Sequence, residues 1–285
     1  MFLSLRCLEA FSYQCGAELN AISWHQEPNR QATRDVLIRL HAHSCRVFSE
    51  ILTLLEAGYA DGAHARWRSL HEVAVIALFL QKHGDQAATL YREHEAVDAW
   101  HGAKEYEKVA AKIKHEPLGP ETMGQLKSRY DAAIARHGPS FKTTYGWAAV
   151  LLKVSRPGLR ELETAVGVEH LRSFYMWASQ QVHAPAKAFT SCLGTLPGQP
   201  KFMLAGASNV GLLDPAQSAA ISLSQVLAAL LLELETVDAP VCSQLAGRLV
   251  DLVKYEGLSA HDSIEGRHHE EWFIVKGAAG GSQRN

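Results

Sequence analysis

The sequence predicts an all-α protein: a single multi-helix, bundle-like domain with a Gly/Pro-rich loop near residues 191–213. Apolar residues recur every three to four positions along most of the 285 residues, which is the period of an amphipathic helix. No stretch alternates between apolar and polar residues for more than a few positions, so strands are not expected. Composition does not divide the chain further. We expect one helical domain over residues 1–255 and a flexible, glycine-containing tail over 256–285.

Glycine and proline mark where the first helices end. Four helices are expected in this part of the chain, over residues 3–22, 30–57, 60–82 and 85–114. The first ends before Pro28 and the second at Gly58, because neither residue favours a helix interior. Gly84 closes the third, Asp85 then provides an N-cap for the fourth, and Pro117 lies beyond its end.

The remaining helices have similar boundaries. They are expected over residues 120–137, 144–154, 158–166, 168–184, 214–237 and 241–255. Pro120 suits the first turn of a helix that ends at Gly138, and Asp214 followed by Pro215 forms an N-cap and first-turn pair. Only Lys201–Leu204 is a candidate for a short extended segment.

The charge of the chain is small in total but uneven along the sequence. A formal net charge of −2 gives no overall field that attracts nucleic acid or an anionic membrane. Residues 101–160 contain eleven Lys or Arg and five Asp or Glu, giving +6, whereas residues 214–256 contain two and six, giving −4. The basic segment is either a solvated helix surface or a surface that faces phosphate.

The cysteine, histidine and apolar patterns bear on the cellular compartment and on membrane or metal binding. The five cysteines are odd in number and lack CxxC spacing, so neither a disulfide framework nor a structural zinc site is expected, and a reducing cytoplasm fits best. Arg6 interrupts the apolar start too early for a secretory signal, and no apolar run reaches the roughly 20 residues that span a bilayer. The fifteen histidines include no HExxH motif. We expect no membrane association, no metal site and no cofactor.

One expected helix carries charged residues into an apolar segment. The residues that share its polar face are Asp61, His64, Arg68, His71 and Glu72. Residues 73–80, which follow, are all apolar, so this part of the helix is expected to be buried on every side. Arg68 and Glu72 are four positions apart at the edge of the core. They form either a structural ion pair or an anion clamp in which Glu72 orients Arg68.

A later helix places Tyr175, Ser179 and His183 on one face at i, i+4 and i+8. This set supplies either a general acid/base with hydrogen-bonding partners, or a buried polar network in which His183 caps the helix. We expect the two helices to meet in one polar seam. The catalytic candidates are Arg68, Glu72, Tyr175, Ser179 and His183.

Three further residues are candidates for ligand binding. His71 shares the polar face of the helix that carries Arg68. His94 lies on the next helix, where it could converge with Glu72 and His183, although no spacing in the chain requires this. Asn209 lies in a loop of small residues just before an expected helix N-terminus, where backbone N–H groups favour anions. The alternative for that loop is a tight turn.

Several motifs resemble those of a bacterial, all-helical family that is catalogued as a domain of unknown function. They are residues 55–63 leading into Arg68-Ser-Leu-His71-Glu72, Tyr175-xxx-Ser179-xxx-His183, Tyr145-Gly146-Trp147-Ala148 and Ser208-Asn209-xx-Leu212. The resemblance covers roughly residues 35–235. The family is in turn distantly similar to the HEPN superfamily of helical proteins, many of which are metal-independent ribonucleases that act as dimers in toxin or phage-defence systems.

The HEPN resemblance implies an Arg that stabilises phosphate and a His that acts in transfer to the RNA 2′-OH, four to six residues apart on one helix. Upstream of His183 the corresponding positions 176–178 hold Met, Trp and Ala, so the signature is absent there. The segments Arg34–His41 and Arg66–His71 have the required spacing.

Two functions follow as expectations. The first is an RNA-cleaving effector in which Arg68 holds phosphate, His183 is the acid/base, Glu72 and Tyr175 support them, and residues 101–160 hold the RNA. Its partners would be RNA and a second copy of the chain. The second is a non-catalytic helical sensor or interaction module, in which the same polar seam binds a small anionic ligand or is structural.

Overall fold

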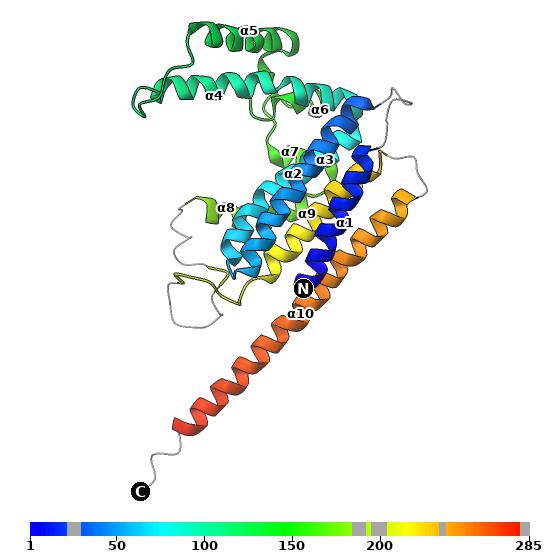
Figure 1. The fold of residues 1–285 in the computed structure, drawn as a ribbon, viewed down its shortest axis with the longest axis vertical. Coiled ribbons are helices and arrows are strands. Elements are labelled where there is room, and N and C mark those ends of the chain that lie inside the picture. The colour runs from blue at the N-terminus through cyan, green and yellow to red at the C-terminus, as the bar shows by residue number, and fades with distance from the viewer. Residues whose placement is uncertain (22–29, 184–191, 195–203, 234–237, 280–285) are drawn as a thin grey trace.

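The computed structural model describes residues 1–21, 30–183, 192–194, 204–233 and 238–279, and every regular element within them is helical. The predicted all-α class is therefore confirmed. The body consists of long helices that pack side by side (Figure 1). They are α1 (Phe2–Ala21), α2 (Gln31–Glu56), α3 (Ala60–Glu93), α9 (Leu213–Leu231) and α10 (Asp238–Ala279).

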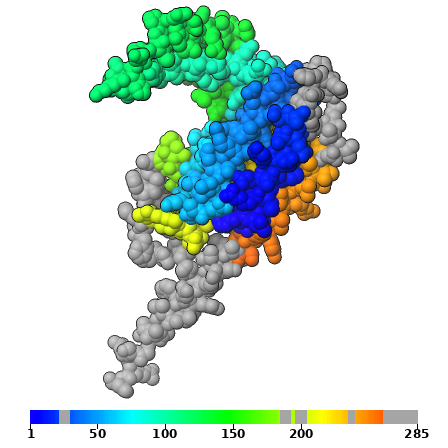
Figure 2. All heavy atoms as spheres, viewed as in Figure 1, coloured from blue at the N-terminus to red at the C-terminus, as the bar shows by residue number. Residues whose placement is uncertain are grey.

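The other elements form an arm and one flank of the body. In the arm, α4 (Glu95–Val109) and α5 (Pro120–His137) pack on each other, and Figure 2 shows them overhanging the body across a hollow. The chain returns to the body through short elements. These are η2 (Pro139–Lys142), η3 (Gly146–Ala148), α6 (Ala149–Leu152), α7 (Leu159–Val166), η4 (Glu169–Leu171) and α8 (Arg172–Val182).

Helix α3 is the centre of the fold, because it packs against α2, α9, α7 and α8. Most of residues 73–80 are buried, as their apolar pattern predicts. Trp67 is fully buried, and its indole nitrogen donates to the Ser222 hydroxyl of α9 at 2.9 Å. The polar face of α3 is thereby directed toward α7 and α8.

The expected break at Gly84 is confirmed, because its backbone is non-helical and divides α3 into two helical parts. Helix α3 continues to Glu93 with a kink at Gly84, whose φ of 67° and ψ of −153° only glycine adopts readily. The Arg30 side chain fills the kink, since a Cβ at Gly84 would lie 2.9 Å from its Nη1. Asp85 does not cap its own helix. Its Oδ1 accepts hydrogen bonds from the amide and hydroxyl of Thr33, at the start of α2, at 2.9 and 2.7 Å.

Other boundaries agree with the sequence to different degrees. The helices expected over 120–137 and 158–166 are found as α5 and α7, whereas the one over 144–154 is divided into η3 and α6. Helix α10 runs to Ala279, past residue 256, and the flexibility expected there stays a prediction. Parts of several predicted segments lie outside the described residues: positions 22, 184 and 234–237 of expected helices, 191 and 195–203 of the expected loop, and 280–285 of the expected tail. In the described part of the chain, no helix is long and apolar enough to cross a membrane.

Candidate functional site

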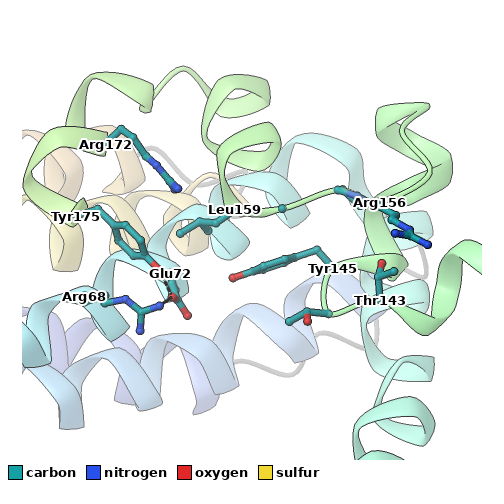
Figure 3. Close-up of a pocket in the computed structure, with 11 residues that line it drawn as sticks. Arg68, Glu72, Thr143, Tyr145, Arg156, Leu159, Arg172 and Tyr175 are labelled. Carbon is teal, nitrogen blue, oxygen red and sulfur yellow. Dashed lines mark hydrogen bonds and ion pairs between the residues drawn. The ribbon is translucent and has the colours of Figure 1, made fainter. Parts of the chain in front are cut away.

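An open cavity of about 580 Å³ lies where α3, α8 and the loops before η3 and α7 meet (Figure 3). Its lining residues are Arg68, Glu72, Thr143, Thr144, Tyr145, Arg156, Pro157, Gly158, Leu159, Arg172 and Tyr175. A volume of this size accommodates a small organic ligand. Three arginines and one glutamate make the lining positively charged.

Arg68 and Glu72 form the ion pair that their spacing predicts. Arg68 Nη2 lies 3.2 Å from Glu72 Oε1, and each side chain is 29% exposed. Arg68 Nε donates to the Ser179 hydroxyl at 3.1 Å, and the Tyr175 hydroxyl donates to Glu72 Oε1 at 2.5 Å. The predicted seam between the two helices therefore exists, and four of its five expected residues contact one another.

The Tyr175 ring holds two arginines in place. The guanidinium carbons of Arg68 and Arg172 lie 4.9 and 5.0 Å from the centre of the ring, within the range of cation–π attraction. Arg172 and Tyr175 are three residues apart on α8, so they share the face that meets α3. Each guanidinium group is therefore held by the ring and by at least one further contact.

A buried carboxylate supports Arg172 from behind. Arg172 Nη1 lies 3.1 Å from Glu163 Oε2, and the His71 side chain donates from Nε2 to Glu163 Oε1 at 2.9 Å. The side chains of His71 and Glu163 have no exposed surface. A buried carboxylate needs such partners to offset the loss of its hydration. His71, a predicted ligand-binding residue, does not line the cavity, but it supports Arg172 through Glu163 and packs against the Tyr175 ring, with ring centres 5.6 Å apart.

Tyr145 extends into the cavity from the loop before η3 (Figure 3). The adjacent Gly146 is pressed against the preceding backbone, where a Cβ would lie 2.5 Å from the Ser140 carbonyl oxygen. Trp147 is buried and packs edge-on against Phe79 of α3, with ring centres 5.5 Å apart. Together, Gly146 and Trp147 fix the loop so that the Tyr145 hydroxyl points toward the Glu72 end of the cavity.

Both phenols of the cavity are hydrogen-bond donors at neutral pH. Burial, with the nearby Glu72 charge, raises the pKa of Tyr145 to about 12. The pKa of Tyr175 is also raised, first by burial and then by its hydrogen bond to Glu72. Neither phenol loses its proton near pH 7, so neither serves as a general base there.

Arg156 is at the opposite end of the cavity from Arg68 and Arg172, beside Thr143 (Figure 3). Its side chain is exposed, and it forms no ion pair with any carboxylate in the part of the chain that the structure describes. The two arginines at the other end each have a glutamate partner. Arg156 therefore contributes a positive charge that the described residues do not balance.

The other predicted site residues lie outside the cavity lining. His183 is exposed at the end of α8, where its backbone N–H donates to the Ser179 carbonyl at 3.2 Å. His94 is buried, and its Nε2 donates to the Thr143 carbonyl at 2.9 Å, which holds the cavity wall. Asn209 is exposed in the loop before α9.

The first part of the polar face of α3 anchors a loop. Asp61 accepts hydrogen bonds from the Leu193 amide at 3.0 Å and the Cys192 thiol at 2.6 Å. The Ser208 amide donates to the Gly58 carbonyl at 2.9 Å. Residues 58–61 therefore hold this loop in place, and they do not line the cavity.

Sequence reasoning did not assign Tyr145, Arg156 and Arg172 to the site. Tyr145 belongs to a motif that resembles the family, which was a usable signal. Arg172 precedes Tyr175 by about one helical turn, so its position on the same helix face could also have been predicted from the sequence. Arg156 was only one of eleven basic residues in an uneven segment, and nothing in the sequence distinguished it.

The fold and the cavity define an all-α protein with an arginine-lined pocket between helices. The chain belongs to a family of unknown function (DUF5677), whose profile matches residues 34–200. The match includes every residue that lines the cavity, and it ends before Asn209. No curated protein and no solved structure matches the chain.

Proposed function

We propose that this protein binds a small anionic ligand with a phosphate group in the arginine-lined cavity. The observation that carries the proposal is the lining charge, three arginines against one glutamate, in a cavity of ligand size. Guanidinium groups bind phosphate through paired hydrogen bonds, which makes arginine the side chain best suited to such a ligand.

Preorganisation of the arginines supports binding. Arg68 is held by Glu72, Ser179 and the Tyr175 ring, and Arg172 by Glu163 and the same ring. Side chains that are already ordered lose less conformational entropy when a ligand binds. In the described part of the chain, Arg68 uses Nε and Nη2 for these contacts, so its Nη1 is left for a ligand.

RNA cleavage is the second candidate, and one observation favours it. Arg68 contacts Ser179 of α8, and His183 follows four residues later at the C-cap of that helix, so the segments that carry the expected phosphate-binding and acid/base residues adjoin. The exposed His183 side chain does not line the cavity. Cleavage would therefore take place at the end of α8, with the RNA reaching from there to Arg68.

Calorimetric titration with n-butyl phosphate tests the first proposal. We expect wild type to bind, Arg156→Gln to bind about tenfold or more weakly, and Arg160→Gln to bind like wild type. The loss corresponds to one charge-assisted hydrogen bond of roughly 1.5–3 kcal/mol. Arg160 is an exposed arginine of α7 outside the cavity, so it is the matched control. No binding by wild type, or equal binding by Arg156→Gln, contradicts the proposal.

Incubation with total RNA and tRNA tests the second candidate. Cleavage by wild type that is lost in both Arg68→Ala and His183→Ala would support it. RNA that wild type leaves uncut under conditions where butyl phosphate binds would reject it and leave the binding function.

A further inference from the structure

We infer that the ligand is a sugar phosphate, with its phosphate at Arg156 and its hydroxyl groups at the Glu72 end of the cavity. The inference rests on the proposed function and deepens it by naming the chemical class of the ligand. The two ends of the cavity differ in the side chains that line them (Figure 3).

The Arg156 end suits the phosphate. Arg156 has no carboxylate partner among the described residues, so a bound anion there competes with no internal one. Thr143 lies at the same end (Figure 3), where its hydroxyl donates to the Ser140 carbonyl at 3.1 Å, and Thr144 also lines the cavity. A phosphate therefore finds at this end a guanidinium group that no described carboxylate neutralises.

The Glu72 end suits hydroxyl groups better than a second anion. Arg68 is paired with Glu72 and Arg172 with Glu163, so two positive charges are balanced by two negative ones. A second anion would also face the Glu72 carboxylate directly. The positive charge that attracts phosphate is consequently concentrated at Arg156.

Donors and an acceptor lie side by side at the Glu72 end. Glu72 Oε1 accepts a hydrogen bond from Tyr175 and forms an ion pair with Arg68, whereas Oε2 accepts no hydrogen bond from the residues that the structure describes. The Tyr145 hydroxyl points toward the same place. A hydroxyl group both donates and accepts, so it can donate to Glu72 Oε2 while accepting from Arg68 or Tyr145. Neighbouring hydroxyls of a sugar satisfy this arrangement.

The middle of the cavity accommodates a sugar ring. Tyr145 and Leu159 lie between the two ends (Figure 3). The face of an aromatic ring is partly negative and favours the partly positive C–H groups that line one face of a sugar. A ligand with a phosphate, a ring and several hydroxyls thus meets a matching partner along the whole cavity.

The test compares ribose 5-phosphate with n-butyl phosphate by calorimetric titration of the full chain. Both are phosphate monoesters, and only the first carries hydroxyl groups. We expect wild type to bind ribose 5-phosphate about tenfold or more tightly, which is the contribution of one hydrogen bond to a charged group. In Glu72→Gln, we expect the ratio of the two affinities to fall toward one.

The outcomes separate the two claims. Equal affinities of wild type for the two esters overturn the sugar phosphate inference and leave the anion-binding function. Absence of binding by both esters overturns both claims. The matched control is Glu105→Gln, which changes an exposed glutamate of α4 and should keep the wild-type ratio. If Glu72→Gln does not fold, the wild-type ratio alone decides the inference.

Discussion

Glu163 Oε1 accepts a hydrogen bond of 2.9 Å from His71, and neither side chain has exposed surface. The other oxygen of the same carboxylate holds Arg172 at the cavity wall. The buried His71–Glu163 pair therefore holds the Arg172 guanidinium group of the candidate site. The residues that stabilise the fold and those that order the site are here in direct contact.

Glu163→Ala is expected to reduce the free energy of unfolding by about 1–3 kcal/mol, because it leaves the buried His71 donor without an acceptor. Glu163→Gln keeps an oxygen at that place and should cost less. Urea unfolding measures both differences. Equal stability of Glu163→Ala and wild type would show that the buried hydrogen bond is not needed.

Arg30→Ala is expected to destabilise the protein by about 3 kcal/mol. Arg30 pairs with Glu233, whose side chain is fully buried, and also donates to the Gln81 carbonyl beside the kink of α3. Removing the arginine leaves a buried carboxylate uncompensated. Arg6→Ala is the control, since Arg6 is itself exposed, pairs with Glu9 and Glu56 at the surface, and should change stability by at most about 1 kcal/mol. Thermal and urea unfolding should therefore show a clearly larger loss of stability for Arg30→Ala than for Arg6→Ala. Similar small losses of stability in the two variants would contradict the stabilising role of the Arg30–Glu233 pair.

Gly146→Ala is expected to weaken binding of phosphate esters and to lower stability, because the new methyl group would displace the loop that carries Tyr145. The matched change is Gly124→Ala in α5, where nothing lies within 4 Å of a Cβ. That change should stabilise the helix by about 0.5–1 kcal/mol and leave binding unaltered. Calorimetric titration and melting of the two variants check this. An unaffected Gly146→Ala variant would mean that the loop is not fixed as described.

Acid is expected to destabilise the protein through His41. Burial lowers its pKa from 6.5 to about 4, so the folded state binds the proton less readily than the unfolded state. The contribution of His41 to stability is complete above pH 6.5 and is lost as pH falls toward 4, by up to about 3 kcal/mol. Urea unfolding between pH 7 and pH 4 should show a smaller loss for His41→Gln than for wild type. Parallel pH profiles would exclude this origin of acid sensitivity.

Sequence patterns correctly predicted those features of the fold that depend on residues close together in the chain. The helical period gave the all-α class, and Pro120 with Gly138 located α5 to the residue. Gly84 was expected to end a helix because glycine disfavours a helix interior, and its non-helical backbone confirms the break. The helix resumes after it because Arg30 and Asp85 connect the kink to α2 and α9, and such long-range contacts leave no local pattern.

In the candidate site too, residues placed by helical spacing were predictable, whereas residues placed by long-range packing were not. Arg68 with Glu72, and Tyr175 with Ser179, are spaced by helical turns, so their shared faces were readable. Arg156 and Tyr145 come from loops whose position depends on packing such as that of Trp147 against Phe79. His183 was expected to face Arg68 because it continues the spacing of Ser179. It does not line the cavity, since α8 ends at Val182 and His183 has extended backbone angles.

A crystal structure of the full chain with ribose 5-phosphate tests the central claim most directly. The account predicts the phosphate at Arg156, the ribose ring beside Tyr145, and a ribose hydroxyl within hydrogen-bonding distance of Glu72. An empty cavity at saturating ligand, or a ligand bound only elsewhere on the protein, would contradict the account.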